Sequence, residues 1–384
     1  MVLMHPIYLD NNATTRIDPR VAEAMQRCHL ARHGNPSSQH AVGRRARQVV
    51  EVARERIAET LGCQVGSARA DRLIFTSGGT ESNNLALIGL AGEPPGEILI
   101  SAIEHPSVVM SAKLLLDRGF SVKAIPVTSD GIIRLDAIPQ MIGPQTRLVS
   151  VMLGNNETGI LQPIRELAAI CHQNGTLLHT DAVQAVGKIE VDFHRLGVDA
   201  LSLTAHKFHG PGGIGALAVR SGIPLKPILM GGFQQLGERP GTESVALIAG
   251  MQRAVELWQV ELRQRLARFT SQRDRLENRI RRDIPSAVVI GAAAPRLPHT
   301  SNIAFPGLDR QSLAMALDLQ DIACSTGSAC ASGSAEPSRI LLAMGIDNSL
   351  IEGSIRFSLG ADTTDAEIDL AAGRICKVVK NLYR

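Results

Sequence analysis

Short apolar runs alternate with amphipathic segments through the first two thirds of the chain. The runs are rich in Val, Ile and Leu and are bounded by Gly, Pro, Asn or Asp, which is typical of buried strands. The segments between them repeat apolar residues at helical spacing, as Val49, Ala53, Ile57 and Leu61 do. This alternation predicts an α/β fold with a mainly parallel sheet and helices on both faces. Strands are expected at residues 7–10, 72–76, 97–101, 122–127, 148–152, 176–179, 198–203 and 214–219.

Asp18 and Pro19 indicate the start of the first helix, as an N-cap and a first-turn proline. Val21, Met25 and Cys28 share one face of that helix, so we expect Cys28 to fill the core and not to react. A second helix should end near Leu61, and a third should cover residues 81–90.

The last third of the chain has a different pattern, which predicts a smaller second domain. A long Arg-rich helical stretch at 243–282 is expected to connect the two parts. Strands are expected at 288–290, 301–305 and 354–358, with helices at 311–317, 337–344 and 364–382. We therefore expect a large domain formed by residues 16–258. Residues 1–15 and 259–384 would form a smaller α/β domain, in which residues 324–336 are a mobile loop.

Composition argues against a nucleic-acid-binding, a membrane or a secreted protein. The 384 residues carry a formal net charge of +3, and 20% are charged, so nothing global favours nucleic acid or a membrane as partner. Six cysteines without a close CxxC pair suit a reducing compartment. The N-terminus does not resemble a signal peptide, and no apolar run is long enough to span a bilayer. A cytoplasmic enzyme is the expectation.

Lys207 lies between two expected strands, flanked by His206 and His209 and followed by a Gly/Pro turn. Burial there would lower the pKa of the Lys207 amine. A neutral amine can attack an aldehyde, which is the requirement for a Schiff-base lysine. A surface lysine in a hairpin loop fits this segment equally well, so the rest of the chain has to decide.

Residues 77–80 form a Gly-rich turn between a strand and a helix, where free backbone N–H groups favour a phosphate and Thr80 can add a hydroxyl. More broadly, reactive side chains follow the carboxyl ends of the expected strands, where open α/β sheets bind ligands. These side chains are Thr80, His105, Asn156, Asp181, Gln184 and Lys207.

Each of these residues has a role if the ligand is pyridoxal phosphate. Asp181 would pair with the pyridinium nitrogen, and His105 would stack on the ring or shuttle a proton. Gln184 would reach the ring oxygen, and the residues holding the phosphate would be Thr80, Thr204 and His206. Taken singly, each residue is explained equally well by a structural role: Asp181 as a helix cap, His105 as a packed side chain and Gln184 as a polar loop residue. The set as a whole favours the cofactor.

Cys330 lies within the Gly/Ser-rich residues 324–336, with no apolar neighbours to bury it. A thiol in such a loop is better placed to react than to pack, so we expect a nucleophile. An inert loop thiol is the alternative. Metal binding is disfavoured because Cys324 and Cys330 have no nearby His or Cys to complete four ligands, and we expect no metal.

The chain resembles the pyridoxal-phosphate-dependent cysteine desulfurases of the nitrogen-fixation and iron–sulfur-assembly type, in class V of the aminotransferases. The motifs that carry the resemblance are at residues 8–15, 34–38, 76–84, 104–105, 155–159, 181–184, 206–207, 239–242, 325–330 and 354–360. The resemblance implies the fold of the type I pyridoxal phosphate enzymes, with a seven-stranded type of sheet in the large domain. Selenocysteine lyase or aminotransferase activity on the same scaffold, and a non-catalytic scaffold protein, are the alternatives.

By that resemblance, Lys207 carries the cofactor, while Gly79 and Thr80 with Thr204 and His206 bind its phosphate. Thr242 would reach the phosphate in the partner subunit of a homodimer. Asn156 and Gln184 would contact the ring, with Asn156 also near the substrate, and Arg356 would clamp the substrate carboxylate. Gly212, in place of a frequent lysine, and the pair Gln235 and Leu236 depart from the family pattern.

The implied reaction converts L-cysteine to L-alanine, with Lys207, Cys330 and His105 as the catalytic residues. The sulfur would remain on Cys330 as a persulfide. It would then pass to an acceptor protein, either an iron–sulfur scaffold or a sulfur carrier.

Overall fold

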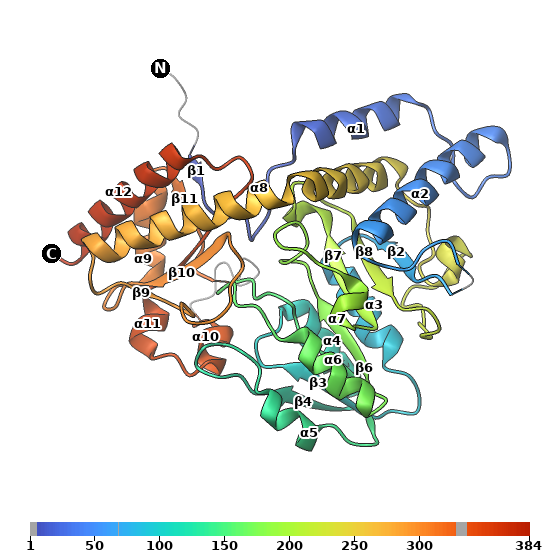
Figure 1. Cartoon of the computed structure of the whole chain (residues 1–384), viewed down its shortest axis with the longest axis horizontal. Helices are drawn as coiled ribbons and strands as arrows, with labels where there is room; N and C mark the ends of the chain where they lie inside the picture. The colour runs from blue at the N-terminus through green and yellow to red at the C-terminus, as the bar shows by residue number, and fades with distance from the viewer. Residues whose placement is uncertain (1–5, 68, 328–335) are drawn as a thin grey trace.

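A seven-stranded sheet forms the centre of the larger part of the molecule in the computed structural model, which describes residues 6–67, 69–327 and 336–384 (Figure 1). Strand β8 runs antiparallel to both of its neighbours, and the other neighbouring pairs are parallel. The expected α/β class with a mainly parallel sheet is therefore confirmed. Across the sheet the order is β2 (Arg72–Thr76), β8 (Gly215–Val219), β7 (Ala200–Thr204), β6 (Leu177–Asp181), β5 (Thr146–Ser150), β3 (Glu97–Ser101) and β4 (Ser121–Ile125).

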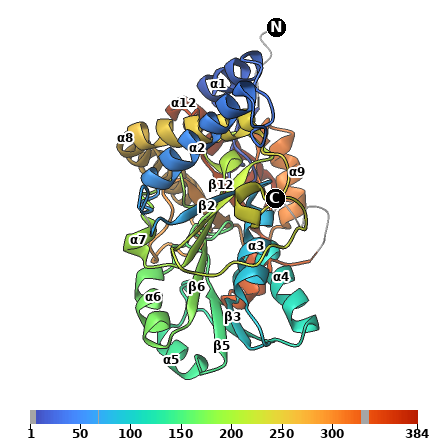
Figure 2. The ribbon, with the colours of Figure 1, turned by 90° about the vertical axis from the view of Figure 1, so that its right-hand side faces the viewer.

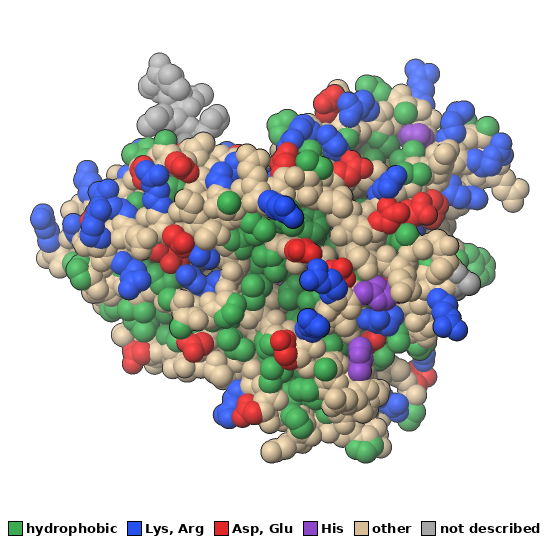
Figure 3. Space-filling model, viewed as in Figure 1, with side chains coloured by type: hydrophobic (Ala, Val, Ile, Leu, Met, Phe, Trp, Pro, Cys, Tyr) green, Lys and Arg blue, Asp and Glu red, His purple; other side chains and the backbone are tan. Residues whose placement is uncertain are grey.

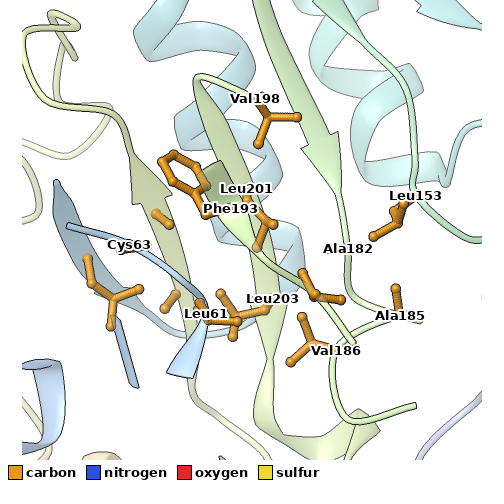
Figure 4. Packing of buried hydrophobic residues seen from close by; sticks show 14 of the residues in the cluster. Leu61, Cys63, Leu153, Ala182, Ala185, Val186, Phe193, Val198, Leu201 and Leu203 are labelled. Carbon is orange, nitrogen blue, oxygen red and sulfur yellow. The ribbon is translucent and has the colours of Figure 1, made fainter. Parts of the chain in front are cut away.

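Helices cover both faces of this sheet, as the view along its edge shows (Figure 2). On one face lie α3 (Gly79–Leu90) and α4 (Pro106–Asp117), whose Leu85 and Val108 join the core with Ile98. Helices that contribute to the core of the other face include α1 (Pro19–Leu30), α2 (Ala41–Thr60), α6 (Ile164–Gln173) and α7 (Phe193–Leu196). There Phe193, Leu201 and Leu203 are fully buried together (Figure 4). Both faces are thus sealed by apolar contacts, which leaves the strand ends as the places open to ligands.

Helix α8 (Val245–Asp283) has 39 residues and joins the two parts of the molecule (Figure 1). Met251 and Trp258 in its first half belong to the core of the large sheet, whereas Phe269 and Leu276 in its second half belong to the core of the smaller part. The domain boundary suggested at residue 258 falls inside this unbroken helix. The division into domains remains a prediction.

The smaller part contains a three-stranded antiparallel sheet with β10 (Thr300–Ala304) between β12 (Ser354–Ser358) and β9 (Val288–Val289). Strand β1 (Ile7–Tyr8) pairs in parallel with β11 (Ile322–Ala323), so the N-terminal segment returns to this part. Its helices are α9 (Arg310–Asp318), α10 (Arg339–Ala343), α11 (Asn348–Glu352) and α12 (Asp365–Leu382). Elsewhere lie α5 (Ile138–Met141) and the 3₁₀ turns η1 (Leu135–Ala137), η2 (Ala205–Lys207) and η3 (Gln234–Gly237).

Two details of packing differ from the expectation. Cys28 is only half-buried on α1 and is not part of the core, because it lies near the exposed end of that helix. On α2 the buried position is Val50, while Val49 is only partly buried. The other three expected positions, Ala53, Ile57 and Leu61, are fully buried, so the apolar spacing placed the helix and, apart from Val49, its buried face correctly.

Charged side chains of both signs are interspersed over the face in Figure 3. Within the described part of the chain, no helix combines the length and apolar character needed to cross a membrane.

Gly187 supports the turn that carries Lys207, and we expect its replacement to be costly. Its φ is +78°, and a Cβ there would lie 2.2 Å from the Cβ of Phe208. Gly187→Ala should lower the free energy of unfolding by about 2–5 kcal/mol, since backbone strain and overpacking add. Gly175→Ala is the matched control, because Gly175 also has a positive φ but no atom within 4 Å of its Cβ position. It should cost about 1 kcal/mol. Urea unfolding compares the two, and equal costs would contradict the packing argument.

Candidate active site

A pocket of about 270 Å³ lies at the carboxyl ends of the large-sheet strands, beside the smaller part. Its lining includes these ten of the expected site residues: Gly79, Thr80, His105, Asn156, Asp181, Gln184, Thr204, His206, Lys207 and Arg356. A larger cavity, about 860 Å³, lies between α2, β2 and residues 233–243 and contains none of them. The chemistry suggested by the sequence therefore belongs to the smaller pocket.

Lys207 ends the short turn η2, directly after β7, and its half-buried side chain lines the pocket. The amine Nζ donates to the backbone carbonyls of Asn12 and Ala13, at 2.5 and 2.7 Å. Lys207 does lie in the hairpin connection between the antiparallel strands β7 and β8, but it lines the pocket and is not a surface lysine. Burial, followed by the charge of Lys207, lowers the pKa of His206 to about 4, so the imidazole is neutral at pH 7.

Asp181 is the last residue of β6, and its carboxylate accepts two N–H groups. Asn83 Nδ2 donates to Oδ2 at 2.7 Å, and the backbone N–H of Val183 donates to Oδ1 at 2.9 Å. Gln184 lies one turn further and donates from Nε2 to the Asn12 carbonyl at 3.0 Å. Its Oε1 is buried and has no partner among the described residues.

The N-terminus of α3 forms another side of the pocket. Its N-cap residue, Gly78, makes no side-chain cap hydrogen bond, so the first backbone N–H groups of the helix are available to an anion. A Cβ on Gly79 would lie 2.8 Å from Val183 Cγ2, which explains the glycine there. Thr80 and Thr204 line the same side of the pocket.

Arg356 is central in β12 and only 1% exposed. Its Nη2 donates to Asp10 Oδ1 at 2.5 Å, and its Nη1 donates to the Asn156 carbonyl at 3.1 Å. Its Nε is buried without a partner among the described residues, as is Asn156 Oδ1. A buried guanidinium donor without an acceptor is costly, which suggests that a ligand oxygen completes it.

Several pocket residues were missed from the sequence. Asn12 and Asn83 line the pocket and bond to Thr300 and Asp181 respectively. Asn83 follows Gly79 by four residues, a spacing that puts both on one face of α3 and could have identified it. Glu104, which precedes His105, does not line the pocket itself. It is buried and accepts from the backbone N–H of the pocket residue Met152, and burial raises its pKa to about 8.

Among the expected site residues that the structure describes, Thr242 does not line this pocket and is exposed in the loop before α8. Cys330 lies outside the described residues. The flanks of that segment are described: the Ser325 and Arg356 backbones pair at 2.7 and 3.2 Å, and Ser338 Oγ donates to Glu157 Oε2 at 2.6 Å. Within residues 6–67, 69–327 and 336–384, no cluster of three His, Cys, Asp or Glu side chains could hold a metal.

The chain is similar to known proteins over nearly its whole length. The family model "Aminotransferase class-V" matches residues 7–370. A cysteine desulfurase of Gluconacetobacter diazotrophicus is 42% identical over 95% of this chain and 91% of its own length. The solved structure of a NifS-like protein has a TM-score of 0.90 and 35% identity, covering 98% of this chain and 100% of that one. The structure of SspA in complex with cysteine has a TM-score of 0.78 and 31% identity, covering 93% and 99%.

The chain therefore belongs to the class V aminotransferase family. Within that family it is one of the cysteine desulfurases of the NifS-like type. Membership implies dependence on pyridoxal phosphate. The residues present fit this cofactor, because the pocket combines an amine, a carboxylate and an open helix N-terminus with the unpartnered oxygens of Gln184 and Asn156.

Proposed function

We propose that this chain converts L-cysteine to L-alanine and retains the sulfur as a persulfide on Cys330. The observation that carries the proposal is the presence in one pocket of Lys207, Asp181 and Arg356, in a member of the cysteine desulfurases. The bound cysteine in the related SspA structure supports the choice of substrate.

In this proposal the cofactor is held by its two ends. Gly79, Thr80, Thr204 and His206 would take the phosphate at the N-terminus of α3, and Asp181 would pair with the ring nitrogen. Gln184 and Asn156 would contact the ring. When bound, pyridoxal phosphate supplies an aldehyde for an amine and a ring that withdraws electrons from the substrate α-carbon.

Arg356 and Lys207 would handle the amino acid. Arg356 would bind its carboxylate through the Nε donor that lacks a partner, while Asp10 and the Asn156 carbonyl hold the guanidinium in place. The Lys207 amine would remove the α-proton of the substrate and later return a proton. Its present bonds to the Asn12 and Ala13 carbonyls would hold it beside the pocket when it is not covalently engaged.

Cys330 would accept the sulfur. Its thiolate forms a bond to the substrate sulfur as the substrate C–S bond breaks, and the electron pair of that bond stays with the carbon skeleton. The skeleton gains protons in place of the sulfur and leaves as alanine. One cysteine and one protein thiol thus give one alanine and one protein persulfide, with no external oxidant.

We further propose that the persulfide passes to an acceptor protein, an iron–sulfur scaffold or a sulfur carrier, and that the chain forms a homodimer. The position of Thr242 supports the dimer, because it is exposed and outside the pocket of its own chain. Such a residue is free to complete the phosphate site of the partner subunit.

Incubation of the yellow holoenzyme with L-cysteine tests the function. Mass analysis of the peptide containing Cys330 should show one added sulfur, with alanine formed in equal amount. Unmodified Cys330 together with pyruvate and a consumed amino-group acceptor would instead favour an aminotransferase. A colourless protein that binds no cofactor would contradict the enzyme proposal altogether.

A further inference from the structure

Four polar side chains of the pocket form a continuous hydrogen-bonded row from Asp181 to His105. Asn83 Nδ2 lies 2.7 Å from Asp181 Oδ2 and 2.8 Å from Ser107 Oγ. Ser107 Oγ lies 2.8 Å from His105 Nδ1. All four residues line the pocket, and they come from β6, α3 and the start of α4.

The direction of each bond in this row is determined by chemistry. A carboxylate only accepts, so Asn83 must present its NH₂ group to Asp181. The second N–H of that group then donates to Ser107 Oγ. The Ser107 hydroxyl, already accepting there, can give its own proton to His105 Nδ1.

The backbone N–H of Ser107 fixes the last bond independently. It donates to His105 Nδ1 at 3.1 Å, because His105 is the N-cap residue of α4. A backbone N–H cannot accept, so His105 Nδ1 must carry a lone pair and no proton. A neutral imidazole with an unprotonated Nδ1 has its proton on Nε2.

The surroundings also keep the imidazole neutral. Burial lowers the pKa of His105, the Asp181 charge opposes this, and the Lys207 charge lowers the pKa again. The positive end of the α4 dipole disfavours an imidazolium in the same way. Glu104, the neighbouring acid, has its pKa raised to about 8 by burial and so adds little negative charge at pH 7.

We infer that Asn83 and Ser107 are positioning residues that form a one-way hydrogen-bond relay from Asp181 and hold His105 as the neutral tautomer protonated on Nε2. His105 Nε2 can then donate a hydrogen bond to a ligand in the pocket, and it has no lone pair to accept one. The use of this donor in catalysis rests on the proposed function, in which the substrate would lie in the pocket that His105 lines. The tautomer itself is a property of the chain.

Nitrogen NMR of the holoenzyme labelled with ¹⁵N-histidine measures the tautomer directly, with His105→Gln used to assign the signals. The wild-type protein should show one His105 form, with Nε2 protonated and Nδ1 unprotonated. A protonated Nδ1, alone or together with a protonated Nε2, would overturn the inference. This outcome does not depend on activity, so it is distinct from failure of the proposed function.

Variants test whether the relay acts on His105. Ser107→Ala, which removes the hydroxyl donor, and Asn83→Ala should shift the Nδ1 signal, and Ser107→Thr should restore it. The tautomer protonated on Nε2 should persist in Ser107→Ala, because the backbone N–H of residue 107 still donates to Nδ1. Ser111→Ala is the matched control, because Ser111 Oγ donates to the Ser107 carbonyl in the same helix and does not contact His105. Unchanged His105 signals in both Ala variants would refute the relay. In Ser107→Ala we also expect kcat to fall roughly tenfold, with little change in KM.

Discussion

Cys330→Ser should reduce sulfur release from L-cysteine by roughly 10³-fold or more, as expected when a covalent nucleophile is lost. A serine hydroxyl cannot hold the transferred sulfur as a persulfide. Cys324 is near in sequence, but burial raises the pKa of its thiol to about 12, so it is a poor replacement. On the described sides of residues 328–335, Ser325 pairs with the pocket residue Arg356, and Ser338 bonds to Glu157, next to Asn156.

The same variant should retain the cofactor. None of the ten expected residues that line the pocket is altered, so the absorbance of the bound cofactor and its response to cysteine should persist. Cys28→Ser, a half-buried cysteine on α1, is the control and should keep full activity. Sulfide assays and absorbance spectra check both, and full activity in Cys330→Ser would refute the nucleophile assignment.

Lys207→Ala should abolish the cofactor absorbance near the edge of the visible range and lower activity by roughly 10³-fold or more. The variant removes the only lysine that lines the pocket within the described residues. Lys207→Arg separates loss of the covalent bond to the cofactor from loss of the hydrogen bonds that the side chain makes. Its guanidinium can still donate to the Asn12 and Ala13 carbonyls, but it cannot bond covalently to an aldehyde. Both variants should therefore lose the absorbance.

Lys226→Ala is the control for the lysine variants, because Lys226 pairs with Glu93 on the surface. Exposed ion pairs contribute little to stability, so its spectrum and rate should match the wild type. Retained absorbance in Lys207→Arg, with cofactor covalently bound, would place the linkage on another residue. A peptide map after borohydride reduction identifies the attached lysine.

Much of the fold could be predicted from local pattern alone. The limits of β2 and β3 in the large sheet and of β12 in the smaller one agree with the expected ranges. Those of the remaining large-sheet strands differ by a residue or two. A strand buried on both sides needs an unbroken apolar run, so its position can be predicted from consecutive residues of the sequence. The side chains that follow these runs reach the same pocket because the carboxyl ends of parallel strands share one edge of a sheet.

Partners distant in the chain could not be predicted in this way. An apolar run indicates that a strand is buried, but it does not indicate the direction of that strand or its partner. The antiparallel direction of β8 and the pairing of β1 with β11 were therefore not predicted. Nor does a sequence show that the Asn12 carbonyl would meet Lys207, that Asp10 would hold Arg356, or that Asn83 would join Asp181 to Ser107. Local residues decide which groups are reactive. The path of the chain decides which atoms lie within 3 Å of them, and thereby where each proton resides.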